Sequence, residues 1–209
     1  MAPKQLLLHP AAKPLLFGLC LLPAAWLVWG AVTDSLGANP AEALVRGTGD
    51  WTLRGLLLTL AITPLRQWTG WHALARFRRM VGLFTFFYGC LHFTCYAWLD
   101  QGFEWDTVVR DIAKRPFILV GFTAWLLMWP LAATSFNRAI KTLGAAHWQA
   151  LHRLVYATAL LALLHFFWMR AAKHDFAEWS VYAAAIGALL GWRLWRLWRT
   201  AAPRRAPAS

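Results

Sequence analysis

Charge is scarce in this chain, and acidic charge is the scarcest. Only 14% of the 209 residues are Asp, Glu, Lys or Arg, and nine are acidic. A soluble domain of this size carries about 25% charged residues. The hydrophobic residues make up 59% of the chain and occur in long blocks rather than amphipathic stripes. These features exclude an ordinary soluble domain and favour a helical integral membrane protein.

Cysteine is scarce as well. Cys20, Cys90 and Cys95 all lie in apolar segments, and no CxxC pair occurs. An odd, unpatterned set argues against a disulfide framework, an iron–sulfur site and a c-type haem attachment. We interpret each cysteine as a small apolar side chain. The sequence also lacks a glycine-rich phosphate loop, an internal repeat and a recognisable soluble domain.

Six apolar segments are candidates to cross a bilayer, which takes about 20 helical residues. The second is the weakest, because it is short and carries Arg54, so its helix must recruit flanking residues. We interpret the first as a span and not a signal peptide, since no small-x-small cleavage site follows it. We therefore predict an all-α six-helix transmembrane bundle in residues 1–200, with a disordered tail in 201–209. The six segments are 15–32, 51–65, 80–99, 117–136, 154–169 and 177–195.

Basic residues gather in alternate loops of this bundle, and the opposite loops hold most of the acids. The net charge of +12 could suggest nucleic acid, but the loop pattern is what membrane insertion requires. Some cations, including Arg110, Lys114 and Arg115, fall on the acidic side. We predict that both termini are cytoplasmic and that the partner of the chain is the lipid bilayer, not nucleic acid.

Three histidines accompany the apolar segments. His92 lies inside 80–99, His165 inside 154–169, and His152 at the mouth of the latter. An ionisable side chain in a membrane span is costly and marks a functional site by default, and imidazole is a common ligand of haem iron. The alternative is a histidine satisfied by a neighbouring hydroxyl or carbonyl or, for His152, an ordinary interfacial histidine.

His92 and His165 are expected at nearly the same depth. The third and fifth spans run in the same direction, and the two histidines lie seven and five residues before 99 and 170. The difference of two residues is about 3 Å of helix. A haem standing between helices 3 and 5 could take one ligand from each and would be six-coordinate, which suits electron transfer.

His152 lies thirteen residues before His165, about 20 Å along a helix, which suits a second haem nearer the cytoplasm. On a straight helix the two side chains point about 140° apart, so sharing a face requires a distortion or offset haems. Arg78 holds the facing position on the third helix. Arginine is a poor iron ligand, but Arg78, Arg79 and Arg153 could bind a haem propionate. The alternative for Arg78 is a simple topology signal.

Four longer stretches of the sequence are distinctive: TPLR at 63–66, RRMVGLFTFFYGCLHF at 78–93, KRPFILVGFTAWLLMWPLAATS at 114–135 and LHRLVYATALLALLHFFW at 151–168. Together with the six segments and the three histidines, they resemble a known family, the ferric-reductase-like transmembrane domain. Within it, the chain is most similar to the haem-binding membrane subunits of bacterial protein-methionine-sulfoxide reductase systems. The resemblance covers nearly the whole chain.

The resemblance implies a b-type cytochrome of the inner membrane with one or two haems b on His92, His152 and His165. It implies electrons from the quinone pool, with quinol as donor, or from a cytoplasmic flavin reductase, with FMN as a candidate cofactor. They pass to a periplasmic molybdopterin-dependent catalytic subunit that reduces methionine sulfoxide. Related eukaryotic reductases carry two histidines on each of the two helices, and this chain departs from them at Arg78.

Entry of electrons is expected near the cytoplasmic face, around Arg78, His147, Trp148, His152 and Arg153.

Two other functions remain open. The first is a membrane ferric or oxygen reductase, which would need a separate flavin partner because about fourteen residues follow the last span. The second is a small transporter or assembly factor, whose intramembrane histidines serve protons or metals; this function predicts no bound haem.

Overall fold

The computed structural model describes residues 3–171 and 174–201, and all regular secondary structure in these ranges is helical. This confirms the predicted all-α class. The element η1 is a short 3-10 turn and η2 is a single π-helical turn. In chain order the elements are α1 (Pro3–Leu8), α2 (Ala12–Val32), α3 (Pro40–Thr69), η1 (His72–Leu74), α4 (Ala75–Cys95), η2 (Tyr96–Asp100), α5 (Trp105–Lys114), α6 (Pro116–Ala133), α7 (Asn137–Leu143), α8 (Ala145–His152), α9 (Leu154–Ala171) and α10 (Ala177–Ala201).

Each of the six predicted spans coincides with a helix. Four stretches are long and apolar enough to cross a membrane, namely Ala12–Val32, His72–Asp100, Pro116–Ala133 and Ala145–Ala171. The other two predicted spans fall in α3 and α10, which have 30 and 25 residues but more polar sequences. The count of six crossings therefore stays a prediction. The predicted tail lies outside the described residues, apart from its first residue at the end of α10.

Helix α3 shows how the short second segment becomes a long helix. Asn39 caps its beginning, where the side chain accepts the Glu42 N–H at 3.1 Å, and Pro40 stands at the first helical position. Proline suits that position because its missing N–H would have no partner in the helix. Gly70, with φ of 68°, ends the helix in the left-handed conformation that glycine adopts freely. The helix thus recruits residues on both sides of 51–65.

A break directly precedes the fifth predicted span, inside the apolar stretch Ala145–Ala171. Helix α8 ends at His152 and α9 begins at Leu154, and Arg153 between them has φ of −69° and ψ of −18°. On a straight helix, His152 and His165 would point about 140° apart. A break in the helix between them is the kind of distortion that could bring them to one face.

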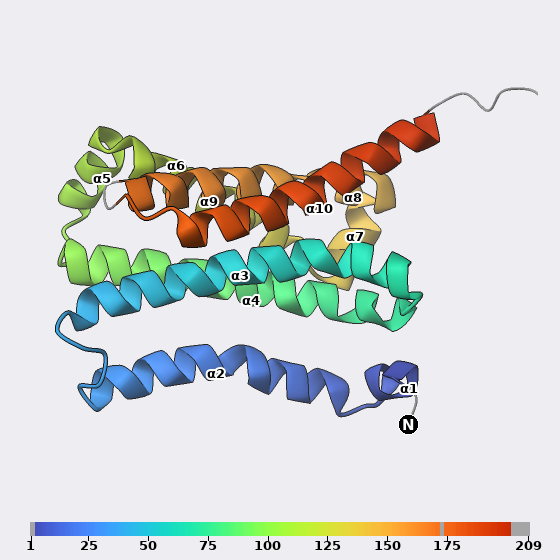
Figure 1. Ribbon diagram of the computed structural model, residues 1–209, viewed down its shortest axis with the longest axis horizontal. Coiled ribbons are helices and arrows are strands. Elements are labelled where there is room, and N and C mark those ends of the chain that lie inside the picture. Colours follow the sequence, from blue (N-terminus) through green and yellow to red (C-terminus); the bar gives the residue numbers. More distant parts are fainter. Residues whose placement is uncertain (1–2, 172–173, 202–209) are drawn as a thin grey trace, which may run out of the picture.

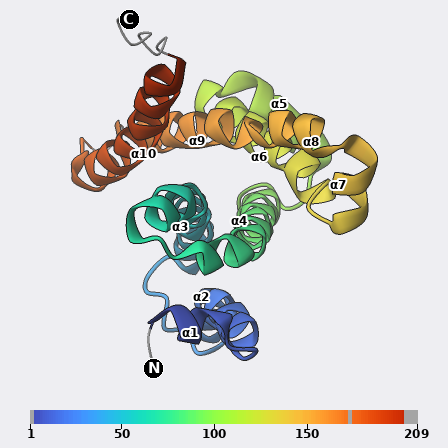
Figure 2. The ribbon, with the colours of Figure 1, turned by 90° about the vertical axis from the view of Figure 1, so that its right-hand side faces the viewer.

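The long helices pack as two facing pairs. Helix α3 packs along α4, α6 packs along α9, and the pairs meet through contacts of α4 with α6 and of α3 with α9. Helix α2 lies against α3 and α4 on the side away from α6 and α9 (Figures 1 and 2). Helix α10 packs on α3 and α9, and this junction holds a buried core. The core residues are Leu53, Leu60, Ala159, Tyr182 and Ile186.

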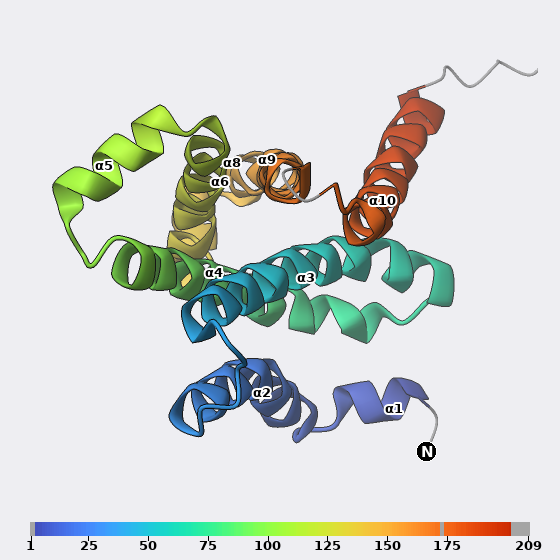
Figure 3. The same cartoon turned by 60° about the vertical axis from the view of Figure 1, so that its left-hand side comes forward.

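The two ends of the bundle differ in charge. We call the end where α3, α6 and α10 begin the acidic end, and the opposite end the basic end. Helix α5 lies across the acidic end, between the end of α4 and the start of α6 (Figure 3). All nine acidic residues of the chain belong to the acidic end: Asp34, Glu42, Asp50, Asp100, Glu104, Asp106, Asp111, Asp175 and Glu178. The basic end holds Arg66, Arg76, Arg78, Arg79, Arg138, Lys141, Arg153, Arg193, Arg196 and Arg199.

Candidate functional site

Two of the three predicted histidines meet inside the bundle. His92 comes from the last turn of α4 and His165 from α9, and their ring centres lie 6.3 Å apart with the rings at 71°. The two side chains are partly buried between the α3–α4 pair and the α6–α9 pair. We call them the histidine pair. The two rings lie at a similar depth in the bundle, as the sequence predicts.

Backbone carbonyls of the facing helices orient both rings. The Nδ1 atom of His92 is 2.9 Å from the Val45 carbonyl oxygen of α3, and that of His165 is 2.6 Å from the Phe117 carbonyl oxygen of α6. A carbonyl oxygen only accepts, so each Nδ1 carries the proton and donates it. Each Nε2 then has a free lone pair, which is the form that binds a metal.

Two glycines make room for the rings. A Cβ atom added at Gly121 of α6 would lie 2.8 Å from Nδ1 of His165, and one added at Gly49 of α3 would lie 3.0 Å from Cε1 of His92. Each imidazole therefore rests directly on the backbone of the helix opposite. The sequence interpretation missed both glycines, because a glycine inside a helix gains this meaning only when its neighbour is known.

The spacing of the histidine pair fits one metal ion between the rings. Imidazoles that bind opposite sides of one iron through Nε2 have ring centres about 6 Å apart, since each bond is about 2 Å long and each nitrogen lies about 1 Å from its ring centre. Two histidines alone do not complete the coordination of iron, and the macrocycle of haem supplies four more donors. The donor set, its tautomer and its spacing therefore fit a haem iron.

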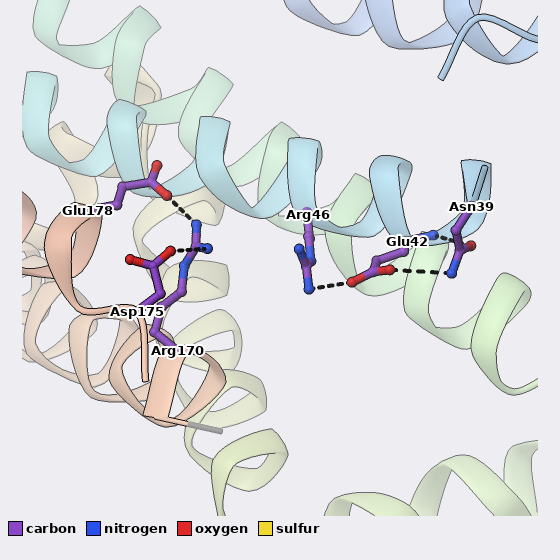
Figure 4. Close-up of polar contacts among 6 residues, drawn as sticks. All are labelled: Asn39, Glu42, Arg46, Arg170, Asp175 and Glu178. Carbon is purple, nitrogen blue, oxygen red and sulfur yellow. Dashed lines mark hydrogen bonds and ion pairs between the residues drawn. The ribbon is translucent and has the colours of Figure 1, made fainter. Parts of the chain in front are cut away.

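Ion pairs fasten the helices around the histidine pair at the acidic end. Arg170, five residues after His165, pairs with Glu178 and with Asp175, the latter at 3.6 Å (Figure 4). On α3, Arg46 pairs with Glu42, which also bonds to Asn39 (Figure 4). The first group joins α9 to α10, so it limits movement of the helix that carries His165.

The third predicted histidine lies in a cavity at the basic end. The cavity has a volume of about 560 Å³ and is lined by residues of α3, α4, α6, α8, α9 and α10. His152 lies in its wall beside Trp148, whose ring stacks on the imidazole with centres 3.9 Å apart. We call this space the basic cavity. Its volume is in the range of ordinary ligand sites, about 300–1,000 Å³.

Five arginines line the basic cavity, and no acidic residue is among its lining residues. Three of them, Arg78, Arg79 and Arg153, were singled out from the sequence as partners for a propionate. The other two, Arg66 and Arg193, were missed. Arg193 lies inside the predicted span 177–195, so its charge within a membrane segment was a signal that could have found it.

The arginines of the basic cavity meet neutral groups. Arg79 donates to the Asn137 amide oxygen at 2.8 Å, Arg193 donates to the Leu60 carbonyl at 2.6 Å, and Arg78 lies 3.4 Å from the Thr63 hydroxyl. The Nε atom of Arg66 is buried without a hydrogen-bond partner. A buried donor without an acceptor is costly, so the cavity is suited to an anionic ligand.

His152 does not repeat the arrangement of the histidine pair. Its Nε2 atom is 3.1 Å from the Thr134 hydroxyl, and this hydroxyl donates to the Pro130 carbonyl at 2.7 Å. Because the hydroxyl proton is used, the oxygen accepts from Nε2–H of His152. The structure places Arg78 in the same cavity and brings no second histidine to it. His147, also expected near electron entry, is exposed on α8 and does not line the cavity.

Comparison with known proteins places this geometry in a family context. Residues 48–163 match the family model described as the ferric reductase like transmembrane component. The match contains His92 and His152 and ends two residues before His165. No solved structure matches the chain.

Several curated proteins are similar over nearly the whole chain, and each is called the protein-methionine-sulfoxide reductase heme-binding subunit MsrQ. The protein from Polaromonas naphthalenivorans is 65% identical over 188 residues, 90% of this chain and 86% of the relative. That from Azospira oryzae is 51% identical over 96% of this chain and 84% of the relative. That from Xanthomonas campestris pv. campestris is 48% identical over 94% of this chain and 93% of the relative.

Proposed function

Because the chain belongs to the MsrQ family of haem-binding subunits and carries a ferric-reductase-like transmembrane domain, we propose that it is a b-type cytochrome of the bacterial inner membrane. It conducts electrons through the bilayer and leaves the chemistry on methionine sulfoxide to a partner subunit. Residues 1–200 act as one domain of six spans with both termini in the cytoplasm. The charge difference between the two ends supports this orientation.

The histidine pair is the observation that carries this proposal. Ring centres 6.3 Å apart, with both Nδ1 atoms bonded to carbonyls, suit two histidines that would hold one haem b through Nε2. Haem b supplies one-electron exchange between ferric and ferrous iron when bound. Held by both His92 and His165, it would serve electron transfer and would not bind a substrate at its iron.

The basic cavity is the proposed site of electron entry. His152 would hold a second haem b there, and Arg78, Arg79 and Arg153 would bind its propionates, as expected from the sequence. Arg66 and Arg193, which line the same cavity, add two further donors. Quinol from the quinone pool, or a cytoplasmic flavin reductase with FMN, delivers electrons at this end.

The acidic end is the proposed site of electron exit. The relatives are named as heme-binding subunits of a protein-methionine-sulfoxide reductase. For this chain we propose a periplasmic molybdopterin-dependent catalytic subunit, MsrP-like, as the acceptor. Reduction of one methionine sulfoxide to methionine and water takes two electrons and two protons, so a haem held by the histidine pair would supply the electrons one at a time.

Haem content of the purified protein tests the proposal. We expect a low-spin b-type spectrum after dithionite reduction and, by pyridine haemochrome, two haems per chain. His92→Ala and His165→Ala should each remove the haem of the histidine pair, whereas His152→Ala should remove only the second haem. His147→Ala is the matched control, because His147 lies on α8 like His152 but is exposed, and it should keep the wild-type spectrum.

Two other results would favour a different function for the chain. A folded chain supplied with haem that shows no haem absorbance contradicts the cytochrome and favours a transporter or assembly factor. A haem-loaded protein that reduces ferric iron or oxygen rapidly with a flavin partner, but does not reduce the periplasmic subunit, favours the ferric or oxygen reductase.

A further inference from the structure

The last turns of α10 repeat the triplet Trp-Arg-Leu. The segment 192–199 reads WRLWRLWR, with tryptophan and arginine each recurring every three residues. A period of three drifts around a helix of 3.6 residues per turn, so successive arginines point in different directions. Arg193 faces the basic cavity, whereas Arg196 and Arg199 are exposed. The two exposed arginines therefore serve something other than the cavity.

Aromatic rings hold both exposed arginines in place. Arg196 donates to the Gln67 side chain of α3, and its guanidinium lies 5.3 Å from the ring centre of Trp192. Arg199 lies 4.6 Å from the ring centre of Trp195. Such cation–π contacts order a guanidinium without neutralising its charge. Each arginine keeps N–H groups free for a further acceptor, since a guanidinium has five.

Large apolar side chains surround these charges. Trp198 is 71% exposed, Leu197 66% and Trp68 63%, and Trp68 packs edge-on against Trp192 with ring centres 5.6 Å apart. Trp195 is about half exposed. Tryptophan with arginine at the end of a long helix is typical of the membrane–water interface. We call this surface, made of Trp68, Trp195, Arg196 and Arg199, the α10 surface.

The length of α10 places this surface at the level of lipid headgroups. The helix has 25 residues, or about 37 Å, and the hydrocarbon core of a bilayer is about 30 Å thick. A helix that begins at the opposite interface therefore carries its last turns past the hydrocarbon. On the proposed topology, in which α10 is the sixth span, Arg196 lies about 28 Å and Arg199 about 33 Å along the helix from Ala177, near the level of the phosphate groups.

No Asp or Glu side chain in residues 3–171 and 174–201 lies at the α10 surface, because all nine acidic side chains belong to the acidic end. The contacts that the described arginines of the basic end make are with neutral acceptors, such as the Leu7 carbonyl for Arg76 and Gln67 for Arg196. The positive charge of this surface is therefore open to an anion from outside the chain, and an anionic bilayer offers one.

We propose that the α10 surface binds the headgroup of an anionic phospholipid. Arg196 and Arg199 hold the phosphate, and Trp195 contacts the glycerol and upper acyl chains. The site is separate from the basic cavity, into which Arg193 faces, and does not depend on the proposed haem ligands. It ties the end of α10 to one leaflet and so helps to fix the helix that covers α3 and α9.

Native mass spectrometry of the full chain, released from detergent with equimolar phosphatidylglycerol and phosphatidylcholine, tests this site. We expect wild-type protein to retain phosphatidylglycerol several-fold more than phosphatidylcholine. The double variant Arg196→Gln with Arg199→Gln should lose most of this preference. The matched control is Arg138→Gln with Lys141→Gln on α7, which removes the same charge at the same end and should keep the preference.

Three results would overturn the proposal: equal retention of the two lipids by wild-type protein, an unchanged preference in the α10 double variant, or an equal loss in the α7 control. Loss of bound phosphatidylglycerol to millimolar inorganic phosphate would also overturn it, because the site would then recognise the free anion and not the lipid. Unchanged haem content and elution volume show that the α10 double variant is folded, and Arg196→Lys with Arg199→Lys should restore part of the preference.

Discussion

The histidine pair and the basic cavity use the same kind of side chain in opposite ways. In the histidine pair, each Nδ1 donates to a backbone carbonyl and each Nε2 is left with a free lone pair. In the basic cavity, Nε2 of His152 donates to Thr134. The first arrangement is set for a metal before any metal arrives. The second requires His152 either to break a hydrogen bond or to bind through Nδ1.

The surroundings of the histidine pair and of the basic cavity also differ. The histidine pair lies against the backbone of Gly49 and Gly121, so its geometry depends on how closely helices approach. The basic cavity is roomy and lined by five long arginines, so its geometry depends on charge and adaptable side chains. The close backbone contacts of the first region suit the rigid metal site proposed there, and the roomier second region suits an anionic ligand whose exact position is less constrained.

The largest loss of haem is expected from a substitution that fills the space behind one of the two histidine rings. In Gly121→Ala the new methyl would lie 2.8 Å from Nδ1 of His165, closer than packed atoms tolerate. The ring must move off the Phe117 carbonyl, and we expect at least a tenfold loss of the low-spin haem at this site. Gly49→Ala brings its methyl to 3.0 Å from Cε1 of His92 and should cause a smaller loss. Pyridine haemochrome quantitation and the low-spin spectrum measure both.

Gly187→Ala is the control for these variants, because nothing lies within 4 Å of the added methyl. It should keep wild-type haem content and, since alanine favours a helix over glycine, should not lower thermal stability. Wild-type haem content in Gly121→Ala would show that the close approach of α6 to His165 does not set the geometry of the site.

The sequence reveals this site only in part, and the reason is physical. His92 and His165 are visible because an imidazole in an apolar run is exceptional. The carbonyls of Val45 and Phe117 are invisible, since every residue has a carbonyl and only the fold selects these two. Likewise, the six predicted segments coincide with helices because apolar blocks are strong signals, whereas the break at Arg153 has no glycine or proline to announce it.

Removing charge from the basic cavity should affect that region alone. In Arg66→Gln with Arg78→Gln, two of the five arginines are lost, and with them much of the attraction for an anionic group. We expect haem per chain to fall from two towards one while the low-spin signal of the histidine pair persists. Haem quantitation combined with a redox titration, which resolves the two components, measures this effect.

Arg138→Gln tests whether position matters as well as charge. Arg138 lies on α7 at the same end but does not line the cavity, so its loss should leave both haems bound. If Arg138→Gln loses as much haem as Arg66→Gln or Arg78→Gln alone, then overall charge, and not the cavity, governs haem binding at the second site. Equal weakening of both haems would remove the distinction between the two regions.

The smallest expected effect comes from the hydroxyl that holds His152. Thr134→Val removes the acceptor of the His152 Nε2 proton, and a hydrogen bond of this kind is worth about 0.5–1.5 kcal/mol. If iron competes with Thr134 for Nε2, the variant should release the second haem about 2- to 10-fold more slowly, measured as transfer to excess apomyoglobin. Thr123→Val is the control, because Thr123 on α6 also bonds the carbonyl four residues earlier but touches no histidine in the described contacts. Faster release in Thr134→Val would contradict the competition and make the hydroxyl a support that orients His152, as the carbonyls do for the histidine pair.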